Sequence, residues 1–234
     1  MQLKEFFRFL KSLPKSLILA LITQMPLEAG VLLRRWYYSR RFAKCGKDLW
    51  VGTNVLISNP GLIEAGDDVK IRENTIIHTG RQKPFSVDGR EVIELTPDKK
   101  EFKGRVILGD HSRIAFGALI LAYGGVKIGE KCGIGPGAVI LSESFHHKGR
   151  QKDRIYKYSQ GALPEEQCVV QGFVEFKDGA GVASHVIVLP GAIIGRDSWV
   201  GPNSVVGIRG RVEEDVIAKG DPAIAVFHRQ YLRE

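Results

Sequence analysis

The chain has 234 residues, 44% hydrophobic and 26% charged, which is typical of a soluble globular protein with room for one large domain or two small ones. Twenty-seven glycines against 9% aromatic residues indicate many tight corners and few large core side chains. The cysteines Cys45, Cys132 and Cys168 lie far apart without metal-ligand spacing. They therefore predict neither a disulfide framework nor a zinc site, and they fit a reducing cytosol.

Residues 1–45 form a strongly basic first segment. Nine lysines and arginines against two acids give it a net charge of +7, whereas the whole chain carries +8. This asymmetry indicates a segment that touches an anionic surface, and it argues against a body that binds nucleic acid throughout. The apolar run at 17–22 is far shorter than the roughly 20 residues that span a bilayer. We expect a basic amphipathic helix that either makes peripheral membrane contact through residues 1–40 or packs on the body.

A six-residue period dominates the body of the chain. Every sixth residue after Phe176 is aliphatic for five steps, and the shorter runs 65–77, 108–120 and 128–140 keep this spacing. The pattern predicts short parallel strands coiled into a prism, with the aliphatic residue inward and a small or β-branched residue two places before it. Glycine often follows the aliphatic residue, and we expect it to supply the unusual backbone angles of a corner. The five steps reach Val182, Val188, Ile194, Val200 and Val206.

Two polar segments interrupt this period. Residues 81–104 predict a long loop or small hairpin between coils, and residues 142–167 predict a second excursion that contains adjacent histidines. We therefore divide the chain into the basic helical segment 1–45, a coiled body at 46–225 with these two protruding loops, and a tail at 226–234. Residues 208–234 are expected to cover the last coil, because a bare parallel edge invites pairing with other chains.

The run GAGVASHVIVLPGAIIGRDSWVGPNSVVG at 179–207, followed by GDPA at 220–223, resembles the C-terminal coils of hexapeptide-repeat sugar and polysaccharide O-acetyltransferases. The hexapeptide signal covers about residues 49–225. The resemblance implies an all-β, left-handed parallel β-helix, acetyl-CoA as the acyl donor, and a homotrimer with active sites between subunits. It implies no metal.

The resemblance also implies a loop histidine that acts as general base on the acceptor hydroxyl. The family histidine follows the inward Ile140 by five residues, where this chain has Phe145. We assign the base to His146, one residue later, with His147 as the alternative, because a near-neutral imidazole can take and release the hydroxyl proton. From their proximity, Glu143 is expected to orient the imidazole and Ser142 to contact the oxyanion.

For the donor, ASHV at 183–186 matches the family segment that lines the pantetheine groove, which nominates Ser184 with Ala183. Gly201 and Pro202 match the next coil, and Gly207 ends the matched run. Small residues leave room for backbone contacts with the pantetheine amides. Basic residues after the last coils are candidates for the CoA phosphates. They are Arg209, Arg211, Lys219 and Arg229.

We therefore predict an O-acetyltransferase that acetylates a sugar hydroxyl of a bacterial surface polysaccharide or lipid-linked precursor. The expected location is cytoplasmic, with attachment at the inner membrane face as the alternative. Three further hypotheses stay open: N-acetylation of an amino sugar nucleotide, a zinc hydratase of the carbonic-anhydrase kind, and a non-catalytic β-helix scaffold. The zinc hypothesis needs three convergent histidines, whereas His78, His111 and His185 are scattered along the chain.

Overall fold

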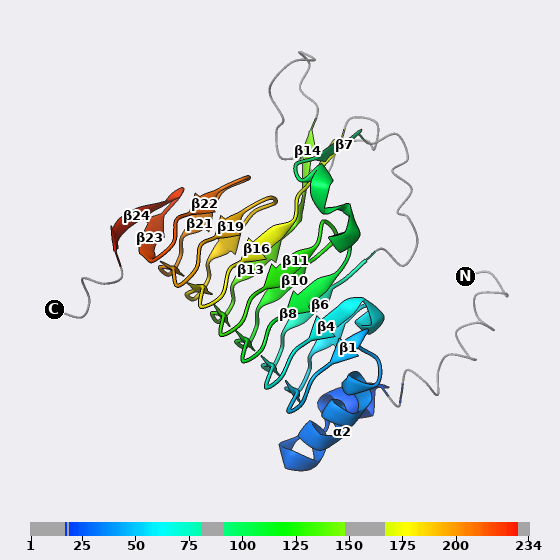
Figure 1. Cartoon of the computed structure of the whole chain (residues 1–234). Coiled ribbons are helices and arrows are strands. Elements are labelled where there is room, and N and C mark those ends of the chain that lie inside the picture. The colour runs from blue at the N-terminus through cyan, green and yellow to red at the C-terminus, as the bar shows by residue number, and fades with distance from the viewer. Residues whose placement is uncertain (1–16, 18, 81–90, 148–166, 229–234) are drawn as a thin grey trace.

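A computed structural model describes residues 17, 19–80, 91–147 and 167–228. Their body is a stack of three-sided coils (Figure 1). Each turn of the chain adds one short strand to each of three sheets, whose strands run parallel within the stack. We call these sheets face A, face B and face C, in the order in which the chain meets them. The predicted parallel coil of hexapeptide repeats is confirmed; its left-handedness stays a prediction.

Each face consists of strands that come from successive coils. Face A contains β1 (Lys44–Cys45), β4 (Ile63–Ala65), β8 (Val106–Leu108), β11 (Val126–Ile128), β16 (Val174–Phe176), β19 (Ile193–Ile194) and β22 (Arg211–Val212). Face B contains β2 (Trp50–Val51), β5 (Lys70–Ile71), β9 (Arg113–Ile114), β12 (Gly133–Ile134), β17 (Gly181–Val182), β20 (Trp199–Val200), β23 (Val216–Gly220) and β24 (Ala223–His228). Face C contains β3 (Leu56–Ile57), β6 (Ile76–His78), β10 (Leu119–Leu121), β13 (Val139–Leu141), β18 (Ile187–Val188) and β21 (Val205–Val206).

The six-residue period fills the interior of the stack. The inward residues counted from Phe176 to Val206 are at most 3% exposed, and the residues two places before them are at most 1% exposed. Each coil has one strand on each of the three faces, and each strand points one large side chain inward. Successive coils therefore stack these side chains into a continuous core. Burying each such side chain contributes about 1.5–3 kcal/mol.

Contrary to our expectation, the glycine that directly follows the inward aliphatic residue does not supply the left-handed corner angle. The left-handed backbone angle falls three residues after the inward residue. Glycines such as Gly137 (φ 64°) and Gly179 (φ 71°) hold this position on some coils, and residues such as His111 (φ 58°) and His185 (φ 58°) hold it on others. The glycine directly after the aliphatic residue instead lies against the next coil. A Cβ on Gly135 would come within 2.4 Å of the Ala183 carbonyl carbon, so close stacking, rather than backbone angle, requires glycine there.

All departures from the six-residue step occur at one corner, between face C and face A. There the chain inserts η1 (Pro60–Leu62), the segment that contains β7 (Glu91–Glu94) and η2 (Pro97–Phe102), a short turn at 122–125, and the segment that contains β14 (Glu143–His147) and β15 (Gln167–Gln171). β14 pairs antiparallel with β15, and β7 pairs parallel with β15. The two loops predicted separately thus join in one three-stranded sheet; residues 81–90 and 148–166 lie outside the described part.

Two different elements close the ends of the stack. At the first coil, α2 (Leu27–Ser39) inserts the buried guanidinium of Arg34, which donates to the carbonyls of Val51 (2.8 Å) and Met25 (2.6 Å). At the last coil, β24 turns back along β23 as an antiparallel strand. No helix in the described ranges is both long and apolar enough to cross a membrane.

Candidate active site

Positions 146 and 147 lie on β14, the strand that leaves the stack at the corner between faces C and A. They are in register with Cys168 and Gln167 of β15. The predicted histidine pair therefore belongs to an ordered strand pair at the edge of face C, rather than to an irregular loop. This places the candidate base beside the fourth coil, where β13 ends.

The polar groups of Ser142 form hydrogen bonds within the corner between faces C and A. Its side chain is fully buried, and its hydroxyl donates to the Leu121 carbonyl (2.8 Å) and accepts from the Gly124 N–H (2.8 Å). Its backbone N–H also donates to Leu121 (2.9 Å). Both donors expected for the oxyanion are used inside the protein, which favours a structural role for Ser142.

Glu143 lies on β14, the strand of the candidate base, three residues before position 146. Its carboxylate is 4% exposed and accepts from the side-chain amide of Gln171, its partner across the strand pair. An extended strand rises about 3.3 Å per residue and alternates its faces, so positions 143 and 146 are about 10 Å apart on opposite faces. Position 147 shares a face with Glu143 but lies about 13 Å away. The role expected for Glu143 beside the candidate base stays a prediction.

The residues predicted for the donor divide between two corners. Ala183, Ser184, Gly201 and Pro202 meet at the corner between faces B and C, where the Ala183 N–H donates to Val200 (2.9 Å) and the Asn203 N–H donates to Ser184 (3.1 Å). We call this the B/C corner. Other candidates lie elsewhere: Gly207, Arg209 and Arg211 follow β21 toward face A, Lys219 packs beside Gly201, and Arg229 falls outside the described residues.

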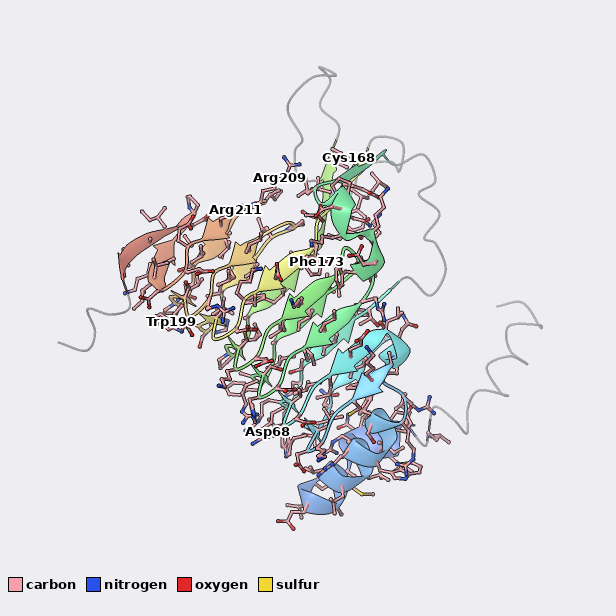
Figure 2. All side chains as sticks on the ribbon, viewed as in Figure 1. Asp68, Cys168, Phe173, Trp199, Arg209 and Arg211 are labelled. Atoms are coloured by element: carbon pink, nitrogen blue, oxygen red, sulfur yellow. The ribbon has the colours of Figure 1, made fainter. Side chains whose placement is uncertain are left out.

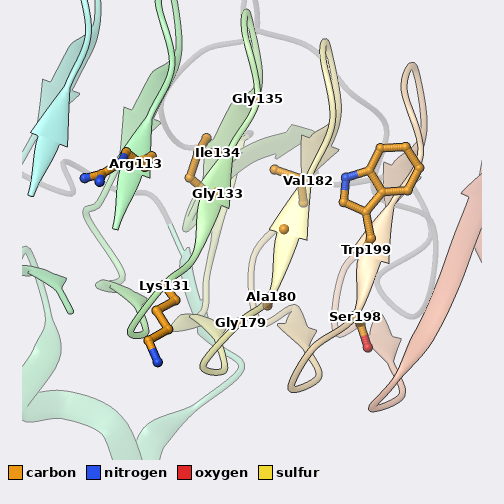
Figure 3. Close-up of a pocket in the computed structure, with 11 residues that line it drawn as sticks. Arg113, Lys131, Gly133, Ile134, Gly135, Gly179, Ala180, Val182, Ser198 and Trp199 are labelled. Carbon is orange, nitrogen blue, oxygen red and sulfur yellow. The ribbon is translucent and has the colours of Figure 1, made fainter. Parts of the chain in front are cut away.

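The sequence reasoning missed a groove of about 300 Å³ on the outer surface of face B (Figure 3). Four residues in register form a row across it, in the order Arg113, Gly133, Gly181, Trp199. The two glycines form the floor: a Cβ on Gly133 would meet no atom within 4 Å, and one on Gly181 would lie 3.2 Å from the Trp199 ring. The signal in the sequence was glycine at the outward position of two successive strands.

The groove is basic at one end. Arg113 donates to the carboxylate (2.8 Å) and the carbonyl (2.7 Å) of Asp68, and His111 lies 3.2 Å from the same carboxylate. The hydrogen bond from Arg113, followed by that from His111, holds the pKa of Asp68 well below its usual range. These contacts fix the Arg113 guanidinium beside the groove, and Lys131 adds a second cation to its lining.

The groove continues into the B/C corner. Gly135 and Val182 line its far end, and Ala183 follows directly. From Arg113 to Trp199 the row crosses three strand spacings, about 14 Å. The groove and the B/C corner together offer an extended surface with cations at one end and small residues at the other.

Face C presents an apolar outer surface. Its outward residues stack in register through all six strands, from Leu56 (51% exposed) to Ile187 (36% exposed) and Val205. The outer surface of face A instead carries ion pairs such as Lys44–Glu64 and Lys127–Glu175. Trp199 on face B and Cys168 on β15 lie on opposite sides of the stack (Figure 2). Face C thus separates the edge that carries the histidines from the B/C corner. The remaining outward residues of this row are Ile76, Leu119 and Val139.

The described residues contain no group of three or more side chains placed to hold a metal ion. His111 and His185 instead occupy left-handed corner positions on different coils. In the described part of the chain, the three cysteines form no disulfide, and burial raises the pKa of the Cys132 thiol to about 11.

No family model and no curated protein matches this chain. Solved structures match over most of its length. A variant of AntD, an N-acyltransferase from Bacillus cereus, in complex with dTDP and coenzyme A is 19% identical, with 86% of this chain and 92% of that chain covered and a TM-score of 0.62. AntD in complex with dTDP and 3-hydroxybutyryl-CoA is 18% identical, with 86% and 91% covered and a TM-score of 0.60. At this identity the likeness establishes a shared fold.

Proposed function

We propose, from a fold shared with a coenzyme A-dependent acyltransferase, that this chain belongs to the hexapeptide-repeat acyltransferases and transfers an acetyl group from acetyl-CoA to a sugar hydroxyl. The observation that carries the proposal is the pair of surfaces at the two edges of apolar face C. One edge bears β14 with the histidines, and the other bears the B/C corner with its groove. A base and a donor site are the two parts that direct acyl transfer needs.

The donor would lie along the groove and the B/C corner. AntD has been solved with coenzyme A bound, which supports acetyl-CoA as the donor for a chain of this fold. Arg113 and Lys131 would pair with its phosphates, because fixed cations form strong charge-assisted bonds with phosphate oxygens. The small residues Ala183 and Ser184 would leave room for the pantetheine amides.

The base would be His146, with His147 as the alternative. An imidazole at this edge takes the proton of the acceptor hydroxyl as its oxygen attacks the thioester carbonyl. The carbon–sulfur bond then breaks and the acetyl group stays on the sugar oxygen. The CoA thiolate takes the proton back from the imidazolium and leaves as the thiol. No covalent intermediate on the protein is required.

A complete site would need more than one copy of the chain. The histidine edge and the B/C corner lie on either side of face C, so one copy holds them apart. The apolar row on face C is the surface on which a second copy would pack, because a contiguous exposed apolar patch marks an interaction site. A homotrimer built through face C would set the histidine strand of one subunit against the donor corner of its neighbour.

The acceptor would be a sugar of a surface polysaccharide or of a lipid-linked precursor. Acylation of an amino sugar nucleotide is the second candidate, and a specific observation favours it. A further AntD variant, 18% identical and with a TM-score of 0.60, was solved with dTDP-4-amino-4,6-dideoxyglucose and coenzyme A. Hydroxyl and amine acceptors must therefore be compared directly.

The test is a transfer assay with the full chain, acetyl-CoA and matched hydroxyl and amino sugar nucleotides, with products identified by mass spectrometry. His146→Ala should lower turnover about 100-fold, as expected for a lost general base, and leave CoA affinity unchanged in calorimetry. His147→Ala is the matched control, with a loss of less than about fivefold expected.

Three outcomes would contradict parts of this proposal. A chain that binds no CoA would favour a non-catalytic scaffold. Acetylation confined to the amine would establish the N-acyltransferase instead. A larger loss in the His147 variant than in the His146 variant would move the base by one residue.

A further inference from the structure

The first coil is covered by α2, whose two sides differ in character. Gly30, Arg34 and Tyr38 are buried against the stack, four residues apart. Leu32 and Trp36 lie on the opposite side of the helix and are 64% and 53% exposed. The helix lies at the end of the stack (Figure 1). Its outer side therefore presents these large apolar residues away from the protein.

The first residue of α2 and the chain before it extend this apolar surface. Leu17, Leu21 and Leu27 are 57%, 66% and 84% exposed, and Leu19 and Met25 are more than one third exposed. Exposed apolar residues are normal when single, whereas a contiguous group marks a contact with a partner or a membrane. Seven such residues fall between positions 17 and 36, and we call them the α2 end surface.

Arginines border this surface. The Arg40 guanidinium lies 4.8 Å from the centre of the Trp36 ring, and that of Arg41 lies 4.2 Å from the centre of the Tyr37 ring. Both cations are held over aromatic rings at the C-terminal end of α2. The described residues between 17 and 45 include five cations and one carboxylate, a net charge of +4, so this end of the molecule is positive.

From this arrangement we propose that the α2 end surface binds anionic lipid bilayers. Leucines enter the acyl boundary, tryptophan suits the interface, and arginines face the head groups, which is how interfacial helices bind. A second copy is a poor occupant, because head-to-head contact would oppose two positive ends, and face C already offers an uncharged surface for self-association.

Binding of a bilayer at the α2 end surface would orient the stack relative to a lipid-linked acceptor. A bilayer at α2 lies at the base of the stack, and β14 leaves the fourth coil three coil spacings above the first, about 14 Å. Because α2 itself is about 10 Å thick, a lipid-linked acceptor whose sugar extends roughly 25 Å from the bilayer would reach that edge. This consequence rests on the proposed function, whereas binding to the bilayer does not.

The test is flotation of the full chain with vesicles of phosphatidylcholine alone and of phosphatidylcholine with 30 mol% phosphatidylglycerol. We expect at least about tenfold stronger partitioning onto the anionic vesicles, reduced by 0.5 M salt, because screening weakens attraction between exposed charges. The double variant Leu32→Ser, Trp36→Ser should lose about tenfold in partitioning. The matched control is Ile224→Ser, Val226→Ser, which removes two exposed apolar residues at the opposite end and should partition like the parent chain.

Circular dichroism establishes that each variant is folded before the comparison. Equal partitioning of the two double variants overturns the proposal, as does equal binding to both vesicle types. A parent chain that floats with neither vesicle also overturns it and leaves the surface to an acidic protein partner. CoA binding, measured in parallel, separates failure of this proposal from failure of the acyltransferase.

Discussion

The space between a residue and the next coil determines which side chain fits at that position of the stack. Gly135 has no room for a side chain because Ala183 lies beneath it, whereas Gly133, two residues earlier, faces open space. Gly135 therefore permits close stacking, and Gly133 leaves a hollow on face B. Several corners with left-handed backbone angles are occupied by polar residues such as His111 and Asp197. These residues adopt the left-handed conformation at a higher free-energy cost than glycine.

The open space above Gly133 gives a direct test of the groove. Gly133→Phe should fold normally, since a Cβ there meets no neighbour within 4 Å and an aromatic residue suits a strand. Its ring would fill the groove between Arg113 and Trp199, and CoA affinity measured by calorimetry should fall at least about tenfold.

Gly207→Phe is the matched control, because a Cβ on Gly207 also meets open space, on the other edge of face C. The groove assignment fails if Gly133→Phe leaves CoA affinity unchanged, above all if this control lowers it. Gly207 would then regain the role that the sequence suggested for it.

Among the elements, the two insertions are folded onto each other. The Phe102 and Phe173 rings pack with centroids 4.8 Å apart, and the Phe173 N–H donates to the Thr96 hydroxyl (2.8 Å). Gly124 and Ser142 are hydrogen bonded across neighbouring turns of the same corner. These contacts position β15, and β15 in turn positions β14, the strand of the candidate base.

Phe173→Ala should therefore affect two properties at once. Removing a buried ring costs about 3–5 kcal/mol, which thermal or denaturant unfolding would measure. Turnover should fall because β14 loses its support, while CoA affinity at the B/C corner stays unchanged. Phe116→Ala is the control for stability, because Phe116 is 56% exposed and its loss should cost little. A Phe173 variant with parental stability would show that the insertions are held in another way.

At the scale of the whole molecule, the three faces have different outer surfaces. Face A carries ion pairs, face B carries the groove, and face C carries the apolar row. In the proposed homotrimer, burial of face C would bring its two edges into one site.

The double variant Leu119→Glu, Val139→Glu should convert a trimer into monomers, because it places two like charges in the apolar row. Analytical ultracentrifugation would measure the mass, and turnover should be lost together with the assembly. Ile107→Glu is the control, since it adds a charge at an outward position of face A beside Lys127. A parent chain that sediments as a monomer would contradict the composite site.

The sequence by itself determined the coil and its interior. A six-residue period is a local property, so the inward row from Phe176 to Val206 could be predicted from spacing alone, and the structure confirms it. The places where the period fails were equally visible as polar segments. Resemblance, rather than spacing, supplied the candidate histidines and the donor corner.

Only the tertiary structure decided how distant segments meet. The groove on face B depends on outward residues of four coils, from Arg113 to Trp199, and their spacing in the chain has no regular pattern. The joining of residues 91–94 with 167–171 depends on both insertions leaving the same corner. The contacts of Ser142 with Leu121 and of Glu143 with Gln171 arise in the same way, because neighbours in an extended chain point apart while residues from different segments come together. The catalytic roles expected for Ser142 and Glu143 stay predictions.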